Sequence, residues 1–478
     1  MKIIKRVVLG FALLGLGLFT AFQLGWLNAG LFLGQQQARN DALIAEEMAF
    51  HTGTLAYLYG YPIVDMLSQM HNETHRVSEQ QDVLAPLNRF FRFPGLVTPE
   101  NSGNLRAPNA DTLYFTAWYD VSDEPIVLST PDTQGRYYTI AVTNLYAEVA
   151  HIGRRTTGTA AGHFLLASYD WTGQPPEGLV VHRVSTSRGW LLGRMYVAGP
   201  DDLSAATTLV DAMRLTPLGA WSSNVMDHPP LNAPIPTGTA LEPHDSLAFF
   251  SILDRALKTL PTRPGEEALR DQFARVLTLG TEHAFNVETL DPATRRGLER
   301  ALKAGADLVE AATKRTIDAY NGWMISMNIG RYGFDYLHRA AVAKGGYGNL
   351  PEESLYPAAV FDAQGHLMSG DNSYEITFPP GGLPPVDGFW SIAAYDLWTL
   401  RMMPNAIDRY TLGDRTPDLV YAPNGSLTVR LQHQMPTETD VNWLPIPRGH
   451  FMLVMRLYEP REAALTHTWV PPTITRLP

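Results

Sequence analysis

Cysteine is absent from this chain of 478 residues. Its absence excludes disulfide bonds, thiol nucleophiles, thiolate metal sites and a lipid-modified cysteine anchor. The sequence also lacks the Gly-x-Ser-x-Gly elbow, the His-Glu-x-x-His motif, the Gly-x-x-x-x-Gly-Lys phosphate loop and the glycine pattern of dinucleotide-binding domains. We therefore expect neither a metal ion nor a cofactor.

Positive charge is scarce. Residues 1–34 hold three basic and no acidic groups, so the remainder carries 34 Lys and Arg against 48 Asp and Glu. This excess of negative charge opposes binding to a phosphate backbone, and nucleic acid is not an expected partner. The hydrophobic content of 45% indicates a folded globular protein, and the length suffices for about two domains.

Charge of either sign is missing from residues 7–34. Lys2, Lys5 and Arg6 precede this stretch, and a basic start before an uncharged apolar run is typical of a signal peptide or a membrane anchor. A signal needs about 15 apolar residues and an anchor about 20, so both alternatives remain open for residues 1–34. In either case we expect a cell-envelope protein whose body lies in the periplasm. It would be either anchored in the inner membrane through its N-terminal segment or secreted to the periplasm after cleavage.

The remaining residues divide by sequence texture into a helical lead-in over 35–90, a first β domain over 91–217, a helical segment over 240–345 and a second β domain over 350–478. Both β regions contain short runs rich in Val, Ile, Thr, Tyr and Trp, separated by Gly, Pro and Asp turns. This pattern favours antiparallel sandwiches or barrels over a parallel α/β sheet. The predicted class is α+β, mainly β, with an N-terminal hydrophobic helix.

Two prolines indicate where predicted helices break or begin. A helix is expected from Ala42 to about Met70, with a break at Tyr61-Pro62, because a proline inside a helix removes a backbone hydrogen bond. Pro292, with Asp291 before it as a cap, predicts the start of a helix that extends to Tyr320.

Residues suited to ligand binding concentrate between positions 107 and 158. Asn109 and Asp111 follow a proline just before a predicted strand, where short polar side chains often bond the local backbone. Asp111 could instead face a cleft as a base or a ligand acceptor, held ionised by a neighbouring arginine. Arg136, Arg154 and Arg155 are candidates for that arginine, although each could instead pair with a structural carboxylate. Arg155 could equally clamp an anionic ligand.

The same stretch contains His151, Tyr114 and Tyr146. The pKa of histidine suits acid–base work, although a lone histidine is more often a structural residue. The tyrosines are either core residues or stacking surfaces for a sugar or another ring.

Specific motifs in both β regions carry a family resemblance. The first region has Pro-Asn-Ala-Asp-Thr-Leu-Tyr at 108–114 and Gly-Arg-Tyr-Tyr at 135–138, and the second has Phe-Trp-Ser at 389–391, Asn-Trp-Leu-Pro at 442–445 and Arg-Leu-Tyr at 456–458. They resemble the bacterial domains of unknown function 1254 and 1214, respectively. This resemblance implies an exported protein with two jelly-roll-like β sandwiches and a helical portion, but it brings no catalytic residue. The chain departs from the usual pattern at Asn144, where an Asp is common.

We interpret the sequence as an exported protein that binds a small polar or sugar-like ligand in a cleft of the first β domain, lined by Asn109, Asp111, Tyr114, Arg136, Tyr146 and Arg155. Two alternatives stay open. A metal-independent hydrolase or isomerase would use Asp111 with His151 or a tyrosine as acid and base, which requires an Asp111 oxygen within hydrogen-bond reach of an Arg, His or Tyr in an open pocket. A purely structural envelope protein would lack such a cleft.

Overall fold

The computed structural model describes residues 2–81, 83–101, 105, 107–222, 235–315 and 319–478, and within residues 2–30 it describes the side chains of residues 20, 23, 26 and 28 alone. The chain forms two compact units, which comprise residues 1–57 with 244–306 and residues 58–243 with 307–478.

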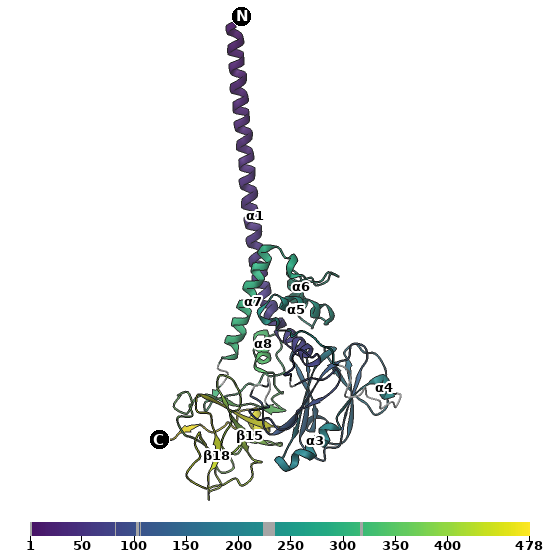
Figure 1. The fold of residues 1–478 in the computed structure, drawn as a ribbon, viewed down its shortest axis with the longest axis vertical. Coiled ribbons are helices and arrows are strands. Elements are labelled where there is room, and N and C mark those ends of the chain that lie inside the picture. The colour runs from purple at the N-terminus through teal and green to yellow at the C-terminus, as the bar shows by residue number, and fades with distance from the viewer. Residues whose placement is uncertain (1, 82, 102–104, 106, 223–234, 316–318) are drawn as a thin grey trace. The chain divides into compact units, whose positions relative to one another are not determined.

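The first unit is helical. It contains α1 (Lys2–Thr74) as far as residue 57, α5 (Ala248–Thr259), α6 (Glu267–Phe273), the short η3 (Val287–Thr289) and α7 (Pro292–Thr313) as far as residue 306 (Figure 1). Asp291 caps α7 as predicted, because its carboxylate accepts hydrogen bonds from the backbone N–H groups of Ala293 and Thr294, both at 3.0 Å. The helix ends at Thr313 rather than at Tyr320.

Close packing between α1 and α7 depends on small residues. A Cβ added at Gly53 would lie 2.8 Å from Leu298, and one added at Gly305 would lie 2.4 Å from the ring of Tyr57. These glycines therefore let the two helices approach each other more closely than larger residues would allow.

In the part of the chain whose side chains are described, no helix combines the length and the apolar composition needed to cross a membrane. The predicted signal or anchor falls mostly on residues whose side chains lie outside that part, and it stays a prediction.

The expected helix break at Pro62 is wrong, since α1 continues to Thr74. An interior proline costs a helix about 3 kcal/mol. Around it, Tyr59, Ile63, Val64 and Met66 are fully buried in the second unit, and each buried apolar side chain contributes about 1.5–3 kcal/mol. Packing thus outweighs the cost of the proline.

The first β domain of the second unit is built from two sheets. Their strands, in spatial order, are β1 (Phe91–Arg92), β2 (Thr112–Asp120), β8 (Arg188–Tyr196), β4 (Tyr138–Asn144) and β5 (Val149–Gly153) in one sheet, and β7 (Val180–Val184), β6 (Gly162–Ser168), β3 (Ile126–Thr130) and β9 (Arg214–Pro217) in the other. Phe115 and Ile140 of the first sheet share a buried core with Leu128 and Leu166 of the second. The two sheets therefore pack face to face as a sandwich.

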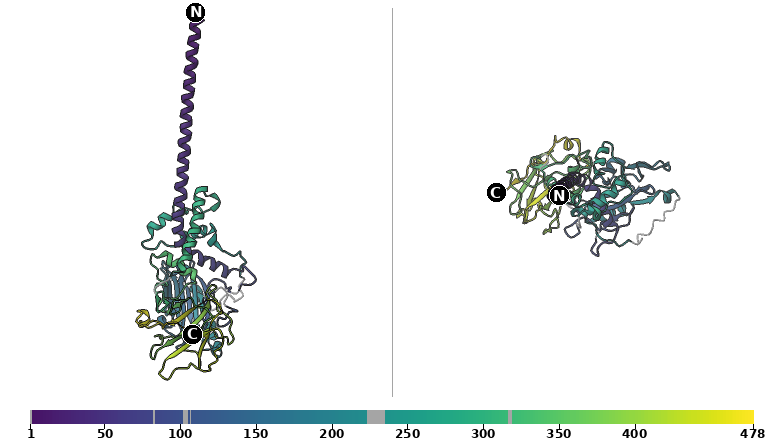
Figure 2. Two further views of the ribbon diagram at one scale, coloured as in Figure 1. Left: turned by 90° about the vertical axis from the view of Figure 1, so that its left-hand side faces the viewer. Right: turned by 90° about the horizontal axis from the view of Figure 1, so that it is seen from above.

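The second β domain repeats this arrangement. Its larger sheet contains β10 (Ala319–Tyr320), β11 (Trp323–Met324), β13 (Ala358–Ala359), β19 (Phe451–Tyr458), β15 (Trp390–Asp396) and β16 (Leu412–Gly413), with β12 (Ser354–Leu355) also paired to β19; the smaller sheet contains β18 (Asn442–Pro445), β17 (Leu427–Gln432), β14 (Tyr374–Phe378) and β20 (Thr475–Arg476). Ile392 and Met455 meet Ile376 and Val429 in the core between them. Figure 2 gives two further views of these strands.

Short helices connect or flank the strands. They are α2 (Arg154–Thr157), η1 (Pro200–Asp202), α3 (Leu203–Asp211), α4 (Leu218–Ser222), η2 (Pro243–Asp245), α8 (Tyr336–Gly345) and α9 (Glu462–Leu465).

The two β domains are joined by a third hydrophobic cluster. Tyr114 and Leu192 from the five-stranded sheet pack with Ala393, Tyr395 and Val454 from the larger sheet of the second domain. The two inner sheets are thus covered on both faces, which explains why β2 is buried along almost its whole length instead of alternating.

The predicted α+β class with two β sandwiches is confirmed. Most strand pairs are antiparallel, although β6 pairs with β7 and β17 pairs with β18 in parallel. The jelly-roll topology stays a prediction.

Candidate functional site

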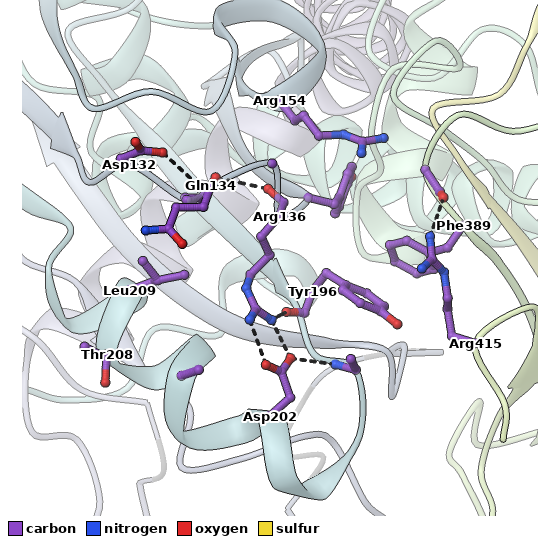
Figure 3. Close-up of a pocket in the computed structure, with 16 residues that line it drawn as sticks. Asp132, Gln134, Arg136, Arg154, Tyr196, Asp202, Thr208, Leu209, Phe389 and Arg415 are labelled. Atoms are coloured by element: carbon purple, nitrogen blue, oxygen red, sulfur yellow. Dashed lines mark hydrogen bonds and ion pairs between the residues drawn. The ribbon is translucent and has the colours of Figure 1, made fainter.

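A cavity of about 630 Å³ lies where residues of both β domains meet. The first domain contributes the turn before β4, the end of β8 and the segment η1–α3, and the second contributes residues 388, 389 and 415. Three arginines line it: Arg136, Arg154 and Arg415 (Figure 3). We refer to it below as the Arg415 cavity.

Arg136 is held by a two-pronged ion pair with Asp202. Its Nη2 lies 2.7 Å from Asp202 Oδ1, its Nη1 bonds Oδ2, and Nη1 also donates to the carbonyl oxygen of Tyr196 at 2.9 Å. The guanidinium lowers the pKa of the Asp202 carboxyl. Both groups are therefore charged at neutral pH, and they largely cancel each other.

Arg154 is also paired. Its Nε lies 3.0 Å from Oε1 of Glu459, and its Nη2 donates to the carbonyl oxygen of Asp387 at 2.8 Å. The hydrogen bonds to Glu459 raise the pKa of Arg154. This arginine ties α2 to the second β domain while its guanidinium lies 5.9 Å from the ring of Tyr137.

Arg415 has the least compensated charge of the three. Its side chain is 56% exposed, and among the described residues its one carboxylate contact is a loose one of 3.7 Å to Asp414. Its guanidinium lies 5.5 Å from the ring of Tyr196 and donates a long bond of 3.3 Å to the carbonyl oxygen of Gly388.

Aromatic rings adjoin this charge. Tyr196 and Phe389 lie 4.7 Å apart between centroids, and Tyr137 contacts Phe389 edge to face at 5.4 Å. Burial raises the pKa of Tyr196, so its hydroxyl stays protonated and can donate a hydrogen bond. An exposed guanidinium, a phenol donor and flat rings together suit an anionic group attached to an apolar or ring-shaped body.

The described lining offers little for acid–base chemistry. It contains no histidine. Of its two carboxylates, Asp202 pairs with Arg136, and Asp132 accepts the backbone N–H of Gln134 at 2.8 Å.

Of the six residues predicted to line the ligand cleft, Arg136 lines this cavity, and the other five lie elsewhere. Asn109 forms the predicted turn: its Oδ1 accepts hydrogen bonds from Asp111 N, Thr112 N and Thr112 Oγ1, each at 2.9 Å, and its Nδ2 donates to Tyr114 Oη at 2.7 Å. Asn109 and Tyr114 are therefore buried structural residues.

Asp111 joins the two β domains. Its carboxylate accepts hydrogen bonds from Ser391 Oγ at 2.6 Å and Thr411 Oγ1 at 3.1 Å, and burial raises its pKa. No Arg, His or Tyr of the described chain donates a hydrogen bond to it, so the geometric requirement of the acid–base hypothesis is not met.

His151 is buried away from Asp111. Its Nδ1 lies 3.1 Å from Thr139 Oγ1, and its Nε2 accepts the backbone N–H of Leu350 at 3.3 Å. Burial, reinforced by the charge of Arg155, lowers its pKa to about 3. His151 is therefore neutral at physiological pH, and its ring nitrogens are engaged in structural contacts.

Arg155 and Tyr146 are also structural. Arg155 Nε lies 2.8 Å from Oε2 of Glu353, a carboxylate that is 1% exposed. Tyr146 is buried, with its ring centroid 6.0 Å from that of Tyr59. The sequence motifs therefore indicate residues that join the domains more than residues that line the cavity.

Sequence reasoning missed Arg415 and Tyr196. Phe389 belongs to a noted motif, but Arg415 stands in a loop after β16 with no local pattern that indicates a ligand. Its position beside Tyr196 arises from the packing of the two domains, which no local sequence signal reports.

Fold and site together define a protein of two packed β sandwiches with an arginine-lined cavity at their junction. Residues 87–217 match the family described as protein of unknown function (DUF1254), and residues 353–462 match that described as protein of unknown function (DUF1214). The predicted resemblance to both families is confirmed, in the predicted order along the chain.

Among solved structures, the VPA0106 protein from Vibrio parahaemolyticus is similar, with a TM-score of 0.65 and 23% identity over 90% of this chain and 100% of that chain. This similarity concerns the fold. A protein from Burkholderia cenocepacia gives a TM-score of 0.43 and 14% identity, over 94% of this chain and 97% of that chain. Comparison with curated proteins found no match.

Proposed function

We propose that the protein binds a small organic anion, such as a sugar acid or another ring-bearing carboxylate, in the Arg415 cavity. The observation that carries the proposal is the exposed guanidinium of Arg415, which lies beside Tyr196 in a cavity whose other arginines are already paired. The ligand's charged group would meet Arg415 and the Tyr196 hydroxyl. Its ring would stack on the aromatic wall.

The test compares matched ligands on the full-length chain by titration calorimetry and thermal shift. A sugar acid is set against its neutral parent sugar, such as glucuronate against glucose, and simple aromatic carboxylates extend the series. We expect the acids to raise the unfolding temperature by binding the native state and the neutral sugars to have little effect. A neutral sugar that binds as tightly as its acid would contradict the role of Arg415.

The matched variants are Arg415→Gln and Arg461→Gln. Arg461 is similarly exposed, at 61%, but it lies outside the cavity and pairs with Asp387. A charge-assisted hydrogen bond contributes about 1.5–3 kcal/mol, so Arg415→Gln should weaken binding roughly 10- to 100-fold. Equal affinities in the two variants would place the site elsewhere.

The expected envelope location belongs to the same proposal. It is supported by the basic residues at positions 2, 5 and 6 and the uncharged stretch that follows them. Protease treatment of spheroplasts tests it: a periplasmic body would be digested in intact spheroplasts, and protection until lysis would contradict the proposal. The mass of the mature N-terminus distinguishes a cleaved signal from an anchor.

A further inference from the structure

A second group of cations lies buried between the two β domains. We call it the Arg194–Arg456 cluster, and it consists of six residues: Tyr114, Arg194, Asn349, Tyr356, Arg456 and Tyr458. Tyr114 and Arg194 are direct cross-strand partners on β2 and β8. Arg456 and Tyr458 stand two residues apart on β19 and so project from the same face of that strand.

Neither arginine has a carboxylate partner among the residues that the structure describes. Arg194 is 8% exposed and Arg456 is 3% exposed. Arg194 Nη1 donates to Asn349 Oδ1 at 2.8 Å, and Arg456 Nη2 donates to the carbonyl oxygen of Ala107 at 2.5 Å. Within the described chain, no carboxylate oxygen lies within ion-pair distance of either guanidinium, a costly arrangement for buried charges.

Asp111 is the nearby negative charge, but one carboxylate cannot compensate two cations. Its charge acts on Arg456, while its oxygens are bonded to the hydroxyls of Ser391 and Thr411. Tyr458 does not supply a second negative charge, because burial raises the pKa of its hydroxyl well above the usual value. The cluster therefore holds an uncompensated positive charge.

Hydrogen-bond donors in the same cluster also lack acceptors. Among the described residues, four buried side-chain atoms have no hydrogen-bond partner: Arg456 Nη1, Tyr458 Oη, Tyr356 Oη and Asn349 Nδ2. Tyr458 lies within electrostatic range of both guanidinium groups. A water molecule would satisfy some of these donors but would leave the charge, whereas an anion satisfies both requirements.

We propose that the Arg194–Arg456 cluster binds a small monovalent anion of about the size of chloride, held by Arg456 Nη1 and the Tyr458 hydroxyl. The ion would lie between β8 of the first domain and β19 of the second, and it would lock the two domains together. This site is separate from the Arg415 cavity, because Tyr137 and Phe389, which line that cavity, pack on Tyr458 with centroids at 5.5 and 4.2 Å. The proposed anion site does not depend on ligand binding in the Arg415 cavity.

The first test is a crystal structure of the full-length chain prepared in bromide, measured at the bromine absorption edge. We expect an anomalous peak within hydrogen-bond distance of Arg456 Nη1 and Tyr458 Oη. An ordered water at that position without an anomalous signal, or bromide found at surface sites alone, would overturn the proposal. This measurement needs no variant and is unaffected by any variant's failure to fold.

A solution test uses two matched tyrosine variants. Tyr458→Phe removes a hydroxyl from the cluster, and Tyr138→Phe removes another buried hydroxyl that also lacks a partner in the described chain but faces the core of the first sandwich. The unfolding temperature is measured while sodium chloride replaces sodium methanesulfonate at constant ionic strength, because methanesulfonate is neither a sugar acid nor a ring-bearing carboxylate. We expect chloride to raise the unfolding temperature of the unchanged protein and of Tyr138→Phe equally. In Tyr458→Phe, the chloride concentration that gives half of this effect should be about tenfold higher. An identical chloride response in all three proteins would contradict the proposal.

Discussion

Ionisation of Glu73 should affect the stability of the protein near neutral pH. Its carboxylate accepts the indole N–H of Trp118 at 2.7 Å. Burial raises its pKa to about 7, more than the Trp118 hydrogen bond lowers it. In the unfolded chain the carboxyl titrates near pH 4.5. Between these values the folded state binds the proton more tightly, so the free energy of unfolding must fall as the pH rises from about 4.5 to 7.

We predict that Glu73→Gln removes this pH dependence. The glutamine oxygen still accepts the indole N–H but carries no charge. The variant should match the unchanged protein at pH 4 and exceed it at pH 8 by on the order of 2 kcal/mol, allowing for partial exposure of the residue. Urea unfolding at several pH values measures the difference, in which the contributions of other groups such as His151 cancel. A difference that stays constant with pH would contradict the raised pKa.

At the residue scale, the sequence predicts a side chain's role where its partners are local. Asn109 binds the backbone two and three residues ahead, as short polar side chains before a strand commonly do. Asp111 and Arg155 bind Ser391 and Glu353, which lie 280 and 198 residues away along the chain. No local pattern indicates such partners, so the sequence could nominate these residues but not assign their roles.

At the element scale, the contact between α1 and α7 should be sensitive to a single methyl group. We predict that Gly305→Ala destabilises the first unit although alanine favours the helix by about 1 kcal/mol. The new Cβ would lie 2.4 Å from Tyr57, and overpacking of this kind costs about 1–3 kcal/mol. The unfolding temperature measures the effect.

The matched control for Gly305→Ala is Gly34→Ala, a helical position on α1 with no atom within 4 Å of the added Cβ. This substitution should leave the unfolding temperature unchanged or raise it slightly. If Gly305→Ala behaved like Gly34→Ala, the helices would not be in the close contact described above.

Some elements follow from sequence pattern and others do not. The cap at Asp291 is a local signal, and it predicted the start of α7 correctly. The hairpin of β10 and β11 turns at Asn321-Gly322, and both residues have positive φ. Asn-Gly is typical of such hairpins, but this turn was missed because the region was predicted to be helical. For β2, burial on both faces removes the alternation that would distinguish an inner strand from any other apolar run.

At the scale of the whole molecule, ion pairs supplement the apolar contact between the two β domains. Glu353, at 1% exposure, receives hydrogen bonds from Arg155 Nε at 2.8 Å and Tyr137 Oη at 2.9 Å, both from the first domain. Arg155 is 30% exposed and can turn toward water. Removal of Arg155 would therefore leave the Glu353 carboxylate buried without a counter-ion. Removal of Glu353 would leave the Arg155 guanidinium free to contact water.

We predict that Arg155→Met destabilises the second unit by about 3 kcal/mol, because it leaves a buried carboxylate without its counter-ion. Glu353→Gln should cost less, about 1–2 kcal/mol, since the freed guanidinium reaches solvent. The double variant should therefore recover part of the stability lost in Arg155→Met.

Arg331→Met is the control, because the side chains of Arg331 and its partner Glu352 are 62% and 39% exposed, and such a surface pair contributes at most about 1 kcal/mol. Denaturant unfolding of the four variants gives the comparison, and equal losses for Arg155→Met and Arg331→Met would show that the buried pair does not hold the domains together.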